Sequence, residues 1–552
     1  MEKPWENRYS NNPFANFNIN ETLYRTYASV ANRFPDDIVL IIDDTQEAFT
    51  HRQFLNLVDI TSEGFIKLGI GCGSKVGVIL NGYLEDAITP LALNKIGAIA
   101  KYIDYMKSVS SIQHSIDETA LDALIIDECF LPLEQAANVH SLPTIVGNAS
   151  RDYCFGHYHN YPKGNDSIAL SYAEAVKFDK DRPSIIISSS GTTGEPKPIV
   201  HSDYSINAAA QKTLYIDYPL SRGNVVLKMI PSQVGLGLIN TLYTGLISGA
   251  TVVMFSCCET DALIGKLVKL TKHFRDLVAK YGLNANAKLN VLTSPLFVRG
   301  LVKSSEEIDF SVLGSLMGGG SKMSKDELDE MTTFAKRRGL VCPICNGYGQ
   351  NEMAGGPVAI NSNLHNVNGS AGFPTYKTDI VVVDPTSYKK LGVNQTGLIL
   401  ESSNSEFLYY EGMPEQTKSA KVTLSDGTKW FNSLDLGYMN EDGFLFITGR
   451  LSRVVIREDH KVSLDEVEQK IRSFSFVEDC ATVISEQGGS VESFVAYIVT
   501  SDEDAVSQLG ASGNLHEYET PSEFIVVKEL PYKSQGKIDY QKLQKIYRET
   551  HK

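Results

Sequence analysis

Hydroxyl-bearing residues and glycines are concentrated between residues 188 and 197, directly after a short β-branched run at 184–187. Glycines let backbone N–H groups approach an anion closely, hydroxyls add donors, and a lysine adds positive charge. The spacing differs from that of a Walker loop. We therefore predict a polyphosphate-binding loop here, in preference to a Ser/Gly-rich surface turn. Its candidate binding residues are Ser189, Ser190, Gly191, Thr192, Thr193, Gly194 and Lys197.

Three later segments contain side chains suited to nucleotide chemistry. Residues 346–352 combine an aromatic, a turn glycine and a carboxylate, residues 430–450 an aspartate and an arginine, and residues 531–539 a lysine after a glycine. Taken singly, these would be interpreted as a core aromatic, a surface ion pair and an inert lysine. Their order along the chain makes them informative together. The residues concerned are Tyr348, Gly349, Asn351, Glu352, Asp435, Arg450 and Lys537.

In this order, the four segments resemble the motifs of the adenylate-forming, or AMP-binding, superfamily of acyl-CoA synthetases, peptide-synthetase adenylation domains and luciferases. The resemblance covers nearly the whole chain, from about residue 20 to about residue 545. It implies a large N-terminal body and a small C-terminal domain that rotates between two half-reactions. In the first, a carboxylate attacks the α-phosphate of ATP to give an acyl-adenylate and pyrophosphate. In the second, a thiol takes the acyl group and AMP leaves.

The resemblance also implies which residues contact the phosphates and the metal. The 188–197 loop matches the family's loop for the β- and γ-phosphates, and Glu352 matches its Mg²⁺-associated glutamate, since hard cations prefer oxygen ligands. Asn351 stands where most members have a threonine that contacts the α-phosphate, and an amide can still donate there. Because the carboxylate and the triphosphate are both anions, such a site needs cations rather than a protein nucleophile.

The remaining motif residues are implied to hold the nucleoside and to close the site. Tyr348 matches the aromatic that stacks on adenine, with Gly349 beside it, and Asp435 matches the aspartate that accepts hydrogen bonds from the ribose hydroxyls. Arg450 fits the arginine at the domain junction. Lys537 matches the mobile lysine that bridges the acyl carboxylate and the α-phosphate. The implied catalytic residues are thus Lys537, Glu352 and Asn351, with ATP and Mg²⁺ as cofactors.

Two further segments could form the walls of the site. Gly319, Gly320 and Ser321 resemble the family's glycine-rich wall beside adenine and the acyl pocket, although a tight turn before a helix starting near Ser324 explains them as well. Residues 229–237 lie where many members carry a histidine or aromatic that gates the acyl tunnel. Val234 stands at that position, so an ordinary Pro/Gly turn is an equal alternative.

Departures from the family pattern bear mainly on the second half-reaction. Ser433 and Leu434 replace the usual Thr-Gly before the ribose aspartate and leave it in register. Asp459 falls at or beside a glycine where pantetheine passes in many members, and Ser452 stands where a hinge aspartate or lysine is common. These differences concern thiol transfer more than adenylation.

The leading hypothesis is an AMP-forming acid–thiol ligase that uses CoA, since no carrier domain is visible beside the two-domain unit. An alternative is a stand-alone adenylation enzyme that loads a carrier protein. Basic residues between 450 and 461 could meet the phosphates of CoA or the acidic helix of a carrier, or could form a solvated face. A third hypothesis is a non-catalytic nucleotide-binding protein of the same fold, which would not require Lys537.

The acid is expected to be a hydrophobic aliphatic or aryl carboxylate. No acidic residue occurs near 232–234 to pair with an α-amino group, which disfavours a plain amino acid. Gly235, Gly237, Gly319 and Gly320 would leave room for a chain or ring.

Composition limits the partners and the compartment. The 552 residues include 51 Lys+Arg and 66 Asp+Glu, a net charge of −15 that disfavours nucleic acid and anionic membranes. The first ten residues lack a hydrophobic signal region and no apolar stretch is long enough to span a bilayer, so we expect a cytoplasmic protein. The Cys342–Cys345 pair is interpreted as part of a buried strand rather than a zinc half-site or redox pair.

Hydrophobic patterns predict the elements that must position these residues. Strands are expected at 38–42, 75–80, 124–126, 184–187, 291–297, 312–317, 379–383 and 444–447, and a helix at 21–33. Alternating strands and helices indicate an α/β fold with a largely parallel sheet, here a multi-lobed body over residues 1–450 that holds the ATP and acid sites. A helix at 464–473 and strands at 481–484, 493–499 and 523–527 predict a small α+β lid domain, residues 453–552, carrying Lys537.

Overall fold

The computed structural model describes most of the chain in two compact units. The described residues are 3–106, 109–117, 120–130, 144–147, 176–189, 197–256, 260–304, 308–320, 323–457, 460–485, 493–511, 514–532 and 538–551. As far as they are described, residues 3–189, 197–379 and 403–419 form the first unit, and residues 380–402 and 420–551 form the second. Among these residues, no helix is both long and apolar enough to cross a bilayer.

One sheet of the first unit carries the phosphate-loop candidate. Within the described residues it has seven strands in the order β18-β8-β7-β4-β3-β5-β6. The run from β7 to β6 is parallel, while β8 and β18 are antiparallel to their neighbours. Ile185, Ile186 and Ile187 are fully buried, as expected for a strand covered on both faces. The strands are β3 (Lys75–Ile79), β4 (Ile99–Tyr102), β5 (Ala123–Asp127), β6 (Thr144–Gly147), β7 (Pro183–Ser188), β8 (Pro198–Ser202) and β18 (Tyr409–Tyr410).

The second sheet of this unit carries the glycine-rich wall and the Tyr348 motif. Nine described strands follow the order β15-β14-β13-β12-β11-β9-β10-β1-β2, and the six from β13 to β1 are parallel. The predicted α/β fold with largely parallel sheets is therefore confirmed. The strands are β1 (Ile38–Ile42), β2 (Glu47–Thr50), β9 (Val225–Lys228), β10 (Thr251–Met254), β11 (Leu289–Thr293), β12 (Leu313–Gly319), β13 (Ile344–Gly349), β14 (Pro357–Ile360) and β15 (Phe373–Pro374).

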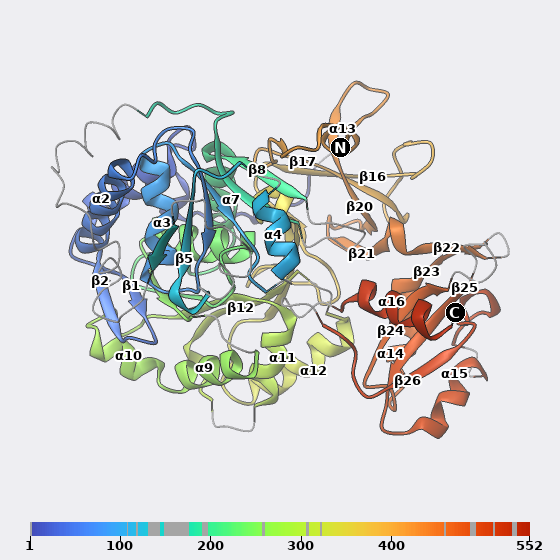
Figure 1. Cartoon of the computed structure of the whole chain (residues 1–552). Coiled ribbons are helices and arrows are strands. Elements are labelled where there is room, and N and C mark those ends of the chain that lie inside the picture. Colours follow the sequence, from blue (N-terminus) through green and yellow to red (C-terminus); the bar gives the residue numbers. More distant parts are fainter. Residues whose placement is uncertain are drawn as a thin grey trace. The chain divides into compact units, whose positions relative to one another are not determined.

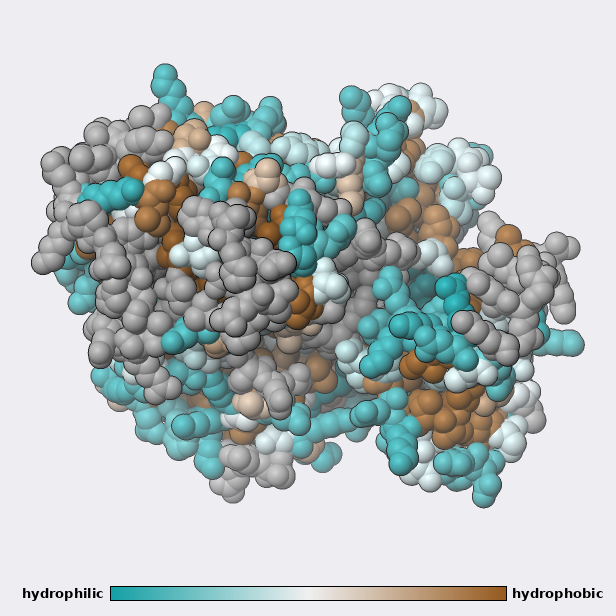
Figure 2. All heavy atoms as spheres, in the orientation of Figure 1, coloured by the Kyte–Doolittle hydropathy of each residue, from teal (hydrophilic) through white to brown (hydrophobic). Residues whose placement is uncertain are grey.

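Helices cover the outer faces of the two sheets and fill the space between them. Helices α9–α12 lie beside one another along one side of the first unit (Figure 1), and they share an apolar core with the nine-stranded sheet. Hydrophilic side chains lie over α9 and α10 on the face shown in Figure 2. Helices α1, α3, α7 and the π-helical η4 pack against one another between the sheets. Their bounds are α1 (Leu23–Arg33), α2 (His51–Lys67), α3 (Leu84–Lys95), α4 (Val109–Asp117), α7 (Asp203–Leu214), η4 (Leu236–Tyr243), α8 (Thr244–Ile247), α9 (Thr260–Lys272), α10 (Phe274–Lys280), α11 (Pro295–Lys303), α12 (Lys325–Lys336) and α13 (Pro414–Ser419).

Helix boundaries follow local capping chemistry, and one strand prediction is wrong because of it. The strand expected at 291–297 ends at Thr293, and α11 begins at Pro295. The fixed φ of proline suits the first helical position, so the helix starts there although the apolar pattern continues. At α12, Ser324 and Glu327 form a capping box, which confirms the helix start expected near Ser324.

The second unit combines an antiparallel sheet with a smaller α+β region. The five-stranded sheet pairs β16-β17-β20-β19 and adds β21 beside β20 within the described residues. The helix expected at 464–473 and the strands expected at 481–484, 493–499 and 523–527 are all present. Their bounds, with the rest of the unit, are β16 (Thr378–Val383), β17 (Gly397–Ser403), β19 (Lys421–Thr423), β20 (Lys429–Met439), β21 (Leu445–Arg450), β22 (Val454–Arg457), β23 (His460–Ser463), α14 (Leu464–Arg472), β24 (Asp479–Ser485), β25 (Ser493–Val499), α15 (Ser507–Ala511), β26 (Phe524–Val527) and α16 (Tyr540–Thr550).

The lid boundary near residue 453 stays a prediction. The second compact unit also contains the antiparallel sheet that precedes this boundary. Gly449 on β21 packs against Ser463 and Asp465 at the start of α14, so the sheet and the α+β region touch within this unit.

Candidate functional site

The predicted site residues fall into three groups. Those on the first unit are Ser189, Lys197, Gly319, Gly320, Tyr348, Gly349, Asn351 and Glu352. Those on the second unit are Asp435 and Arg450. Those outside the described residues are Ser190, Gly191, Thr192, Thr193, Gly194, Ser321 and Lys537, together with Asp459.

The two ends of the phosphate-loop candidate are hydrogen-bonded to each other at the end of β7 and the start of β8. The N–H of Ser189 donates to the carbonyl of Lys197 over 2.9 Å, and the N–H of Lys197 donates to the hydroxyl of Ser189 over 3.0 Å. Strands β7 and β8 are antiparallel neighbours up to the pair Ser188 and Pro198. Ser189 and Lys197, the described residues on either side of 190–196, are therefore adjacent at this end of the sheet, as the two ends of a closed anion-binding loop would be.

Asn351 links this loop base to the segment that precedes η4. Its side-chain amide donates to the carbonyl of Ser188 over 2.8 Å, and its side-chain oxygen accepts from the N–H of Gly235 over 3.3 Å. At least part of the amide predicted to contact the α-phosphate is thus engaged with the protein. Asn351 begins a short 3₁₀ turn, η6 (Asn351–Met353), which carries Glu352.

His201 supports the same segment and was not predicted from the sequence. It lies on β8, fully buried, and its Nε2 donates to the carbonyl of Asn351 over 2.8 Å. A carbonyl oxygen only accepts, so Nε2 carries the proton and Nδ1 faces the Ser205 hydroxyl at 3.4 Å. Burial lowers the pKa of His201 to about 4, so the ring is neutral at physiological pH.

Glu352 and Lys197 are brought together by Tyr410, which sequence analysis also missed. The Tyr410 hydroxyl donates to Oε1 of Glu352 over 2.9 Å, and the Lys197 ammonium lies 4.9 Å from the centroid of the same ring. Burial, followed by the Glu352 charge, raises the pKa of Tyr410 above its ordinary value, so the hydroxyl keeps its proton and donates. No local pattern marks Tyr410, because its role depends on the pairing of β18 with β8.

The glycine-rich wall is formed by the carboxyl ends of two parallel strands. Gly319 of β12 lies opposite Gly347 of β13, directly before Tyr348. Among the described residues, a Cβ at Gly319 would meet only the Gly347 carbonyl at 3.8 Å and the Met317 side chain at 4.0 Å, so these residues leave room beside it. Gly320 has a φ of +88°, a conformation that side chains rarely adopt. Carboxyl ends of parallel strands are the usual place for ligands in α/β sheets.

Two other glycines do not leave the room that was expected. A Cβ at Gly235 would lie 2.6 Å from the Cα of Gly355, and one at Gly237 would lie 2.3 Å from the carbonyl oxygen of Ile230. Both positions are closed by backbone atoms, so the prediction that they make space for a chain or ring is wrong. Gly235 and Gly237 instead allow close packing of the 229–237 segment.

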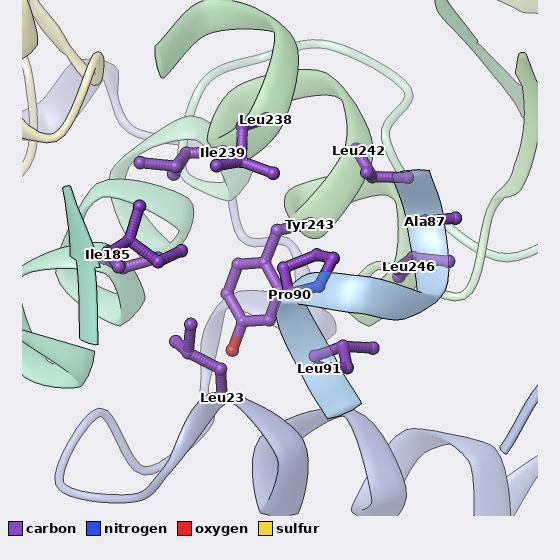
Figure 3. Close-up of a pocket in the computed structure, with 11 residues that line it drawn as sticks. Leu23, Ala87, Pro90, Leu91, Ile185, Leu238, Ile239, Leu242, Tyr243 and Leu246 are labelled. Atoms are coloured by element: carbon purple, nitrogen blue, oxygen red, sulfur yellow. The ribbon is translucent and has the colours of Figure 1, made fainter. Parts of the chain in front are cut away.

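A cavity between η4 and α3 is lined by apolar side chains that do not suit a carboxylate. It is bordered by Leu238 and Tyr243 of η4 and by Pro90 and Leu91 of α3 (Figure 3). All of its described lining residues are apolar or aromatic. Helices with π-type hydrogen bonding are wider than α-helices and are frequent near functional sites. The cavity lies between core helices, and we assign it no ligand.

A buried carboxylate lies close to Ser232, which sequence spacing did not reveal. Asp86, on α3, accepts from the Ser232 hydroxyl and from the Lys228 ammonium, each over 2.7 Å. Both charged side chains are almost fully buried. Lys228 is the positive partner of Asp86. The preference against a plain α-amino acid substrate stays a prediction.

On the second unit, Asp435 and Arg450 face each other across two paired strands. They are register partners on β20 and β21, and Nε of Arg450 lies 2.8 Å from Oδ1 of Asp435. The Asp435 side chain is 4% exposed and that of Arg450 is 39% exposed. A nearly buried carboxylate with one arginine partner can still accept hydrogen bonds at further lone pairs.

A bulge in β20 explains how the altered residues before Asp435 preserve its position. The β17–β20 register shifts between Leu398 and Leu400, opposite the 433–435 segment. Leu434 adopts a left-handed φ of 59°, at the position where the resemblance leads one to expect glycine, and it is 45% exposed. The Ser433 hydroxyl accepts from the N–H of Asp435 over 3.0 Å. Bulges of this kind re-aim the following side chain.

Comparison with known proteins places the chain in a family. The model of the family described as AMP-binding enzyme matches residues 27–410, more than half of the chain. The chain belongs to the AMP-binding enzyme family. The match includes the 188–197 loop, the glycine-rich wall, the 346–352 motif and Tyr410, and it ends before Asp435.

Named relatives agree with this assignment, and solved structures share the fold. The AMP-binding enzyme is 24% identical over 485 residues to "4-coumarate--CoA ligase 3" of Oryza sativa subsp. japonica, covering 85% of this chain and 81% of that one. The ATP-bound structure of MatB from Rhodopseudomonas palustris has a TM-score of 0.79 at 18% identity, covering 96% and 100% of the two chains. The anthranilate CoA ligase AuaEII with anthranoyl-AMP has a TM-score of 0.79 at 18% identity, covering 97% and 98%.

The basic residues after β21 in this AMP-binding enzyme are partly engaged with its own carboxylates. The Arg453 guanidinium lies 2.5 Å from Asp465 and 2.6 Å from Glu468 and is 14% exposed. Arg457 donates to the carbonyl of Thr520, and the His460 ring stacks on Tyr518. Arg453 therefore stabilises the α+β region and does not belong to a solvent-facing anion site.

The remaining question about the site is which side chains could bind a metal and whether the Cys342 and Cys345 thiols could take part in chemistry. Within the described ranges, no group of three or more His, Cys, Asp or Glu side chains could hold a metal ion by itself. Mg²⁺ in ATP-dependent enzymes is held by one or two carboxylates together with substrate phosphates, a role that Glu352 fits. Cys342 and Cys345 are buried, and burial raises the pKa of the Cys342 thiol to about 11 and that of Cys345 further still. These thiols are protonated core groups, as interpreted from the sequence.

Proposed function

We propose that this AMP-binding enzyme activates a carboxylic acid with ATP, forming an acyl-adenylate and pyrophosphate, and then transfers the acyl group to the thiol of CoA. The observation that carries the proposal is the arrangement of Lys197, Tyr410 and Glu352 at the closed base of the phosphate loop. An ammonium that could meet phosphate oxygens lies over the Tyr410 ring, and a carboxylate that could bind a metal lies at its hydroxyl, which supports the proposal. A reaction between two anions needs such charges.

Each residue has a distinct part in the proposed reaction. Lys197 and the 188–197 loop would hold the β- and γ-phosphates, and Glu352 would hold Mg²⁺, which supplies positive charge to the triphosphate when bound. Tyr348 would stack on adenine, with Gly319 leaving space beside it. Asp435 and Arg450 would bind the ribose, and Lys537 would bridge the acid and the α-phosphate. One N–H of the Asn351 side-chain amide would keep its hydrogen bond to the Ser188 carbonyl, and the other N–H would donate to the α-phosphate.

CoA is proposed as the acceptor because the curated relatives of similar extent are named as CoA ligases. A carrier protein remains the alternative acceptor. A cytoplasmic location and the lack of a nucleic-acid partner remain predictions from composition.

The acid is proposed to be an aryl or aliphatic carboxylate without a free α-amino group. Two observations support this class: Asp86 near Ser232 is already paired with Lys228, and Gly319 leaves space in the wall. The names of the relatives refer to coumarate and anthranilate, which are aryl acids. Val234 at the gate position is a short aliphatic side chain that is half-buried.

The decisive experiment is carboxylate-dependent exchange of labelled pyrophosphate into ATP with a panel of aryl, aliphatic and amino acids. We expect exchange with at least one aryl or aliphatic acid, and acyl-CoA detected by mass spectrometry only when CoA is added. Exchange with no acid in the panel would contradict enzymatic activation and favour the non-catalytic hypothesis. Exchange without acyl-CoA, but with acylation of a supplied carrier protein, would establish the alternative acceptor.

Lys537→Ala provides the matched test of the two half-reactions. We expect this variant to lose pyrophosphate exchange while retaining most of the thiol transfer from a supplied acyl-adenylate. Equal loss of both steps would contradict the assignment of Lys537 to adenylation alone.

A further inference from the structure

Tyr410 is the described side chain that contacts both charged groups at the loop base. Its ring is 4% exposed, its hydroxyl donates to Oε1 of Glu352 over 2.9 Å, and the Lys197 ammonium lies 4.9 Å from the ring centroid. A single rigid side chain thus meets the carboxylate with its polar end and the ammonium with its aromatic face.

Tyr410 is itself held in place by short interactions around β18. Its N–H donates to the Thr417 hydroxyl over 2.9 Å, and the N–H of Glu411 donates to the carbonyl of Pro198 over 2.9 Å. The Lys75 ammonium lies 2.6 Å from the Glu411 carboxylate, which fixes the strand from the other side. Tyr410 therefore has a defined position relative to β8 and Lys197.

The Glu352 main chain is tied to the same segment. Its carbonyl accepts from the N–H of Phe407 over 2.8 Å, and the Phe407 ring packs against Tyr410 with centroids 4.7 Å apart. Backbone and carboxylate of Glu352 are thus both fixed by residues 407–410. A ligand carboxylate oriented by an outer hydrogen bond binds a metal better than one that is free to rotate.

We propose that Tyr410 is a positioning residue that orients Glu352 toward the metal and holds Lys197 toward the phosphates. The inference rests on the proposed function, because the metal and the phosphates belong to ATP binding. The hydroxyl acts on the metal through Glu352, and the ring acts on the phosphates through Lys197 by cation–π attraction. The two roles are separable, since one depends on a single oxygen and the other on the ring.

Three variants separate these roles. Tyr410→Phe removes the hydroxyl and keeps the ring, while Tyr410→Leu removes both. Tyr409→Phe is the matched control, because Tyr409 is the neighbouring residue of β18 and is 41% exposed. Thermal unfolding checks that the Phe variants keep the wild-type fold, as expected for loss of one oxygen from a ring that remains buried.

Two binding measurements without any acid test the roles. Mn²⁺ affinity in the presence of saturating ATP is measured by electron paramagnetic resonance, and metal-free ATP affinity in EDTA by calorimetry. We expect Tyr410→Phe to weaken Mn²⁺ binding about 10-fold, as for other outer hydrogen bonds to metal ligands, with metal-free ATP affinity unchanged. Tyr410→Leu should also weaken metal-free ATP binding about 2- to 5-fold, and Tyr409→Phe should change neither.

A double-mutant cycle shows whether Tyr410 acts through Glu352. On a Glu352→Gln background, Tyr410→Phe should cause little further loss of Mn²⁺ affinity. Wild-type Mn²⁺ affinity in Tyr410→Phe, or the same additional loss on both backgrounds, would overturn the proposal. Failure of acid-dependent pyrophosphate exchange with normal Mn²⁺ and ATP binding would instead contradict the proposed function and leave the role of Tyr410 supported.

Discussion

Asn351 donates its side-chain amide to the backbone carbonyl of Ser188 over 2.8 Å, although 163 residues separate them in the chain. The same side chain accepts from the N–H of Gly235. One amide therefore joins the end of β7, the start of the η6 turn that carries Glu352, and the segment before η4. A threonine, common at this position in the family, is shorter and has a single hydroxyl donor.

Substitution of Asn351 should affect ATP use according to the hydrogen bonds lost. We expect Asn351→Ala to lower kcat/KM for ATP in pyrophosphate exchange by about 10-fold or more, since two hydrogen bonds are removed. Asn351→Asp should be worse, because a carboxylate oxygen then faces the Ser188 carbonyl oxygen. An Asp variant that matches or exceeds the Ala variant would show that the bond to Ser188 has no role in ATP use.

Asp435 should confer a preference for the ribose hydroxyls. Wild-type protein is expected to bind ATP about 10- to 100-fold more tightly than 2′,3′-dideoxy-ATP, from hydrogen bonds to a charged acceptor. Asp435→Ala should largely abolish this preference, whereas Glu441→Ala, at an exposed carboxylate of the same unit, should keep it. Calorimetric titration with both nucleotides measures the ratio, and an unchanged ratio in Asp435→Ala would refute ribose recognition by Asp435.

The left-handed backbone at Leu434 is a site where glycine should stabilise the protein. A side chain at positive φ costs roughly 1–2 kcal/mol, and the greater flexibility of unfolded glycine offsets about 0.5–1 kcal/mol of the gain. We expect Leu434→Gly to raise the free energy of unfolding by about 0.5–1 kcal/mol in urea titrations. Leu434→Ala keeps the Cβ and should show no such gain. A Gly variant less stable than the Ala variant would argue against backbone strain at this bulge.

Gly319 and Gly235 should respond differently to the same substitution. A Cβ at Gly319 would make ordinary contacts, so Gly319→Ala should fold normally and reduce the use of bulky acids relative to small ones in pyrophosphate exchange. Gly235→Ala would place a Cβ 2.6 Å from the Gly355 backbone and should instead lower the melting temperature. An unchanged acid preference in Gly319→Ala would remove this glycine from the wall of the acid site.

His201 should make the stability of the first unit sensitive to acid. Its pKa is lowered from 6.5 to about 4 by burial, so the folded ring stays neutral while the unfolded chain takes up a proton below pH 6.5. Its contribution is therefore complete above pH 6.5 and decreases toward pH 4, by up to about 1.4 kcal/mol per pH unit for one proton.

His201→Gln tests this linkage while keeping a donor for the Asn351 carbonyl. Between pH 7.5 and 5, the free energy of unfolding should fall less steeply with pH in the variant. The difference in slope should correspond to about one proton, or up to about 1.4 kcal/mol per pH unit. His51, whose pKa burial also lowers to about 4, should leave part of the slope in both proteins. Identical slopes for wild type and variant would show that His201 does not titrate on unfolding.

Most individual strands could be predicted because they depend on local hydrophobic patterns. The strand expected at 493–499 coincides with β25, and those at 38–42 and 184–187 coincide with β1 and the centre of β7. The 291–297 prediction failed where Pro295 starts a helix inside a continuing apolar run. Gly235 and Gly237 were misjudged for a related reason, since a residue's type does not show what backbone packs against it.

The sequence by itself determined the family and the order of the motifs, because these are properties of residue type and spacing. It also predicts which residues would meet ATP. Only the tertiary structure decided that Tyr410 lies between Lys197 and Glu352, that His201 supports Asn351 and that Asp86 reaches Ser232. These contacts follow from the pairing of β18 with β8 and from the packing of α3 against the segment that carries Lys228 and Ser232. In each case the two partners are more than 140 residues apart in the chain. Periodicity is a local property, whereas the side chains that meet at a sheet edge depend on which strands pair and in which register.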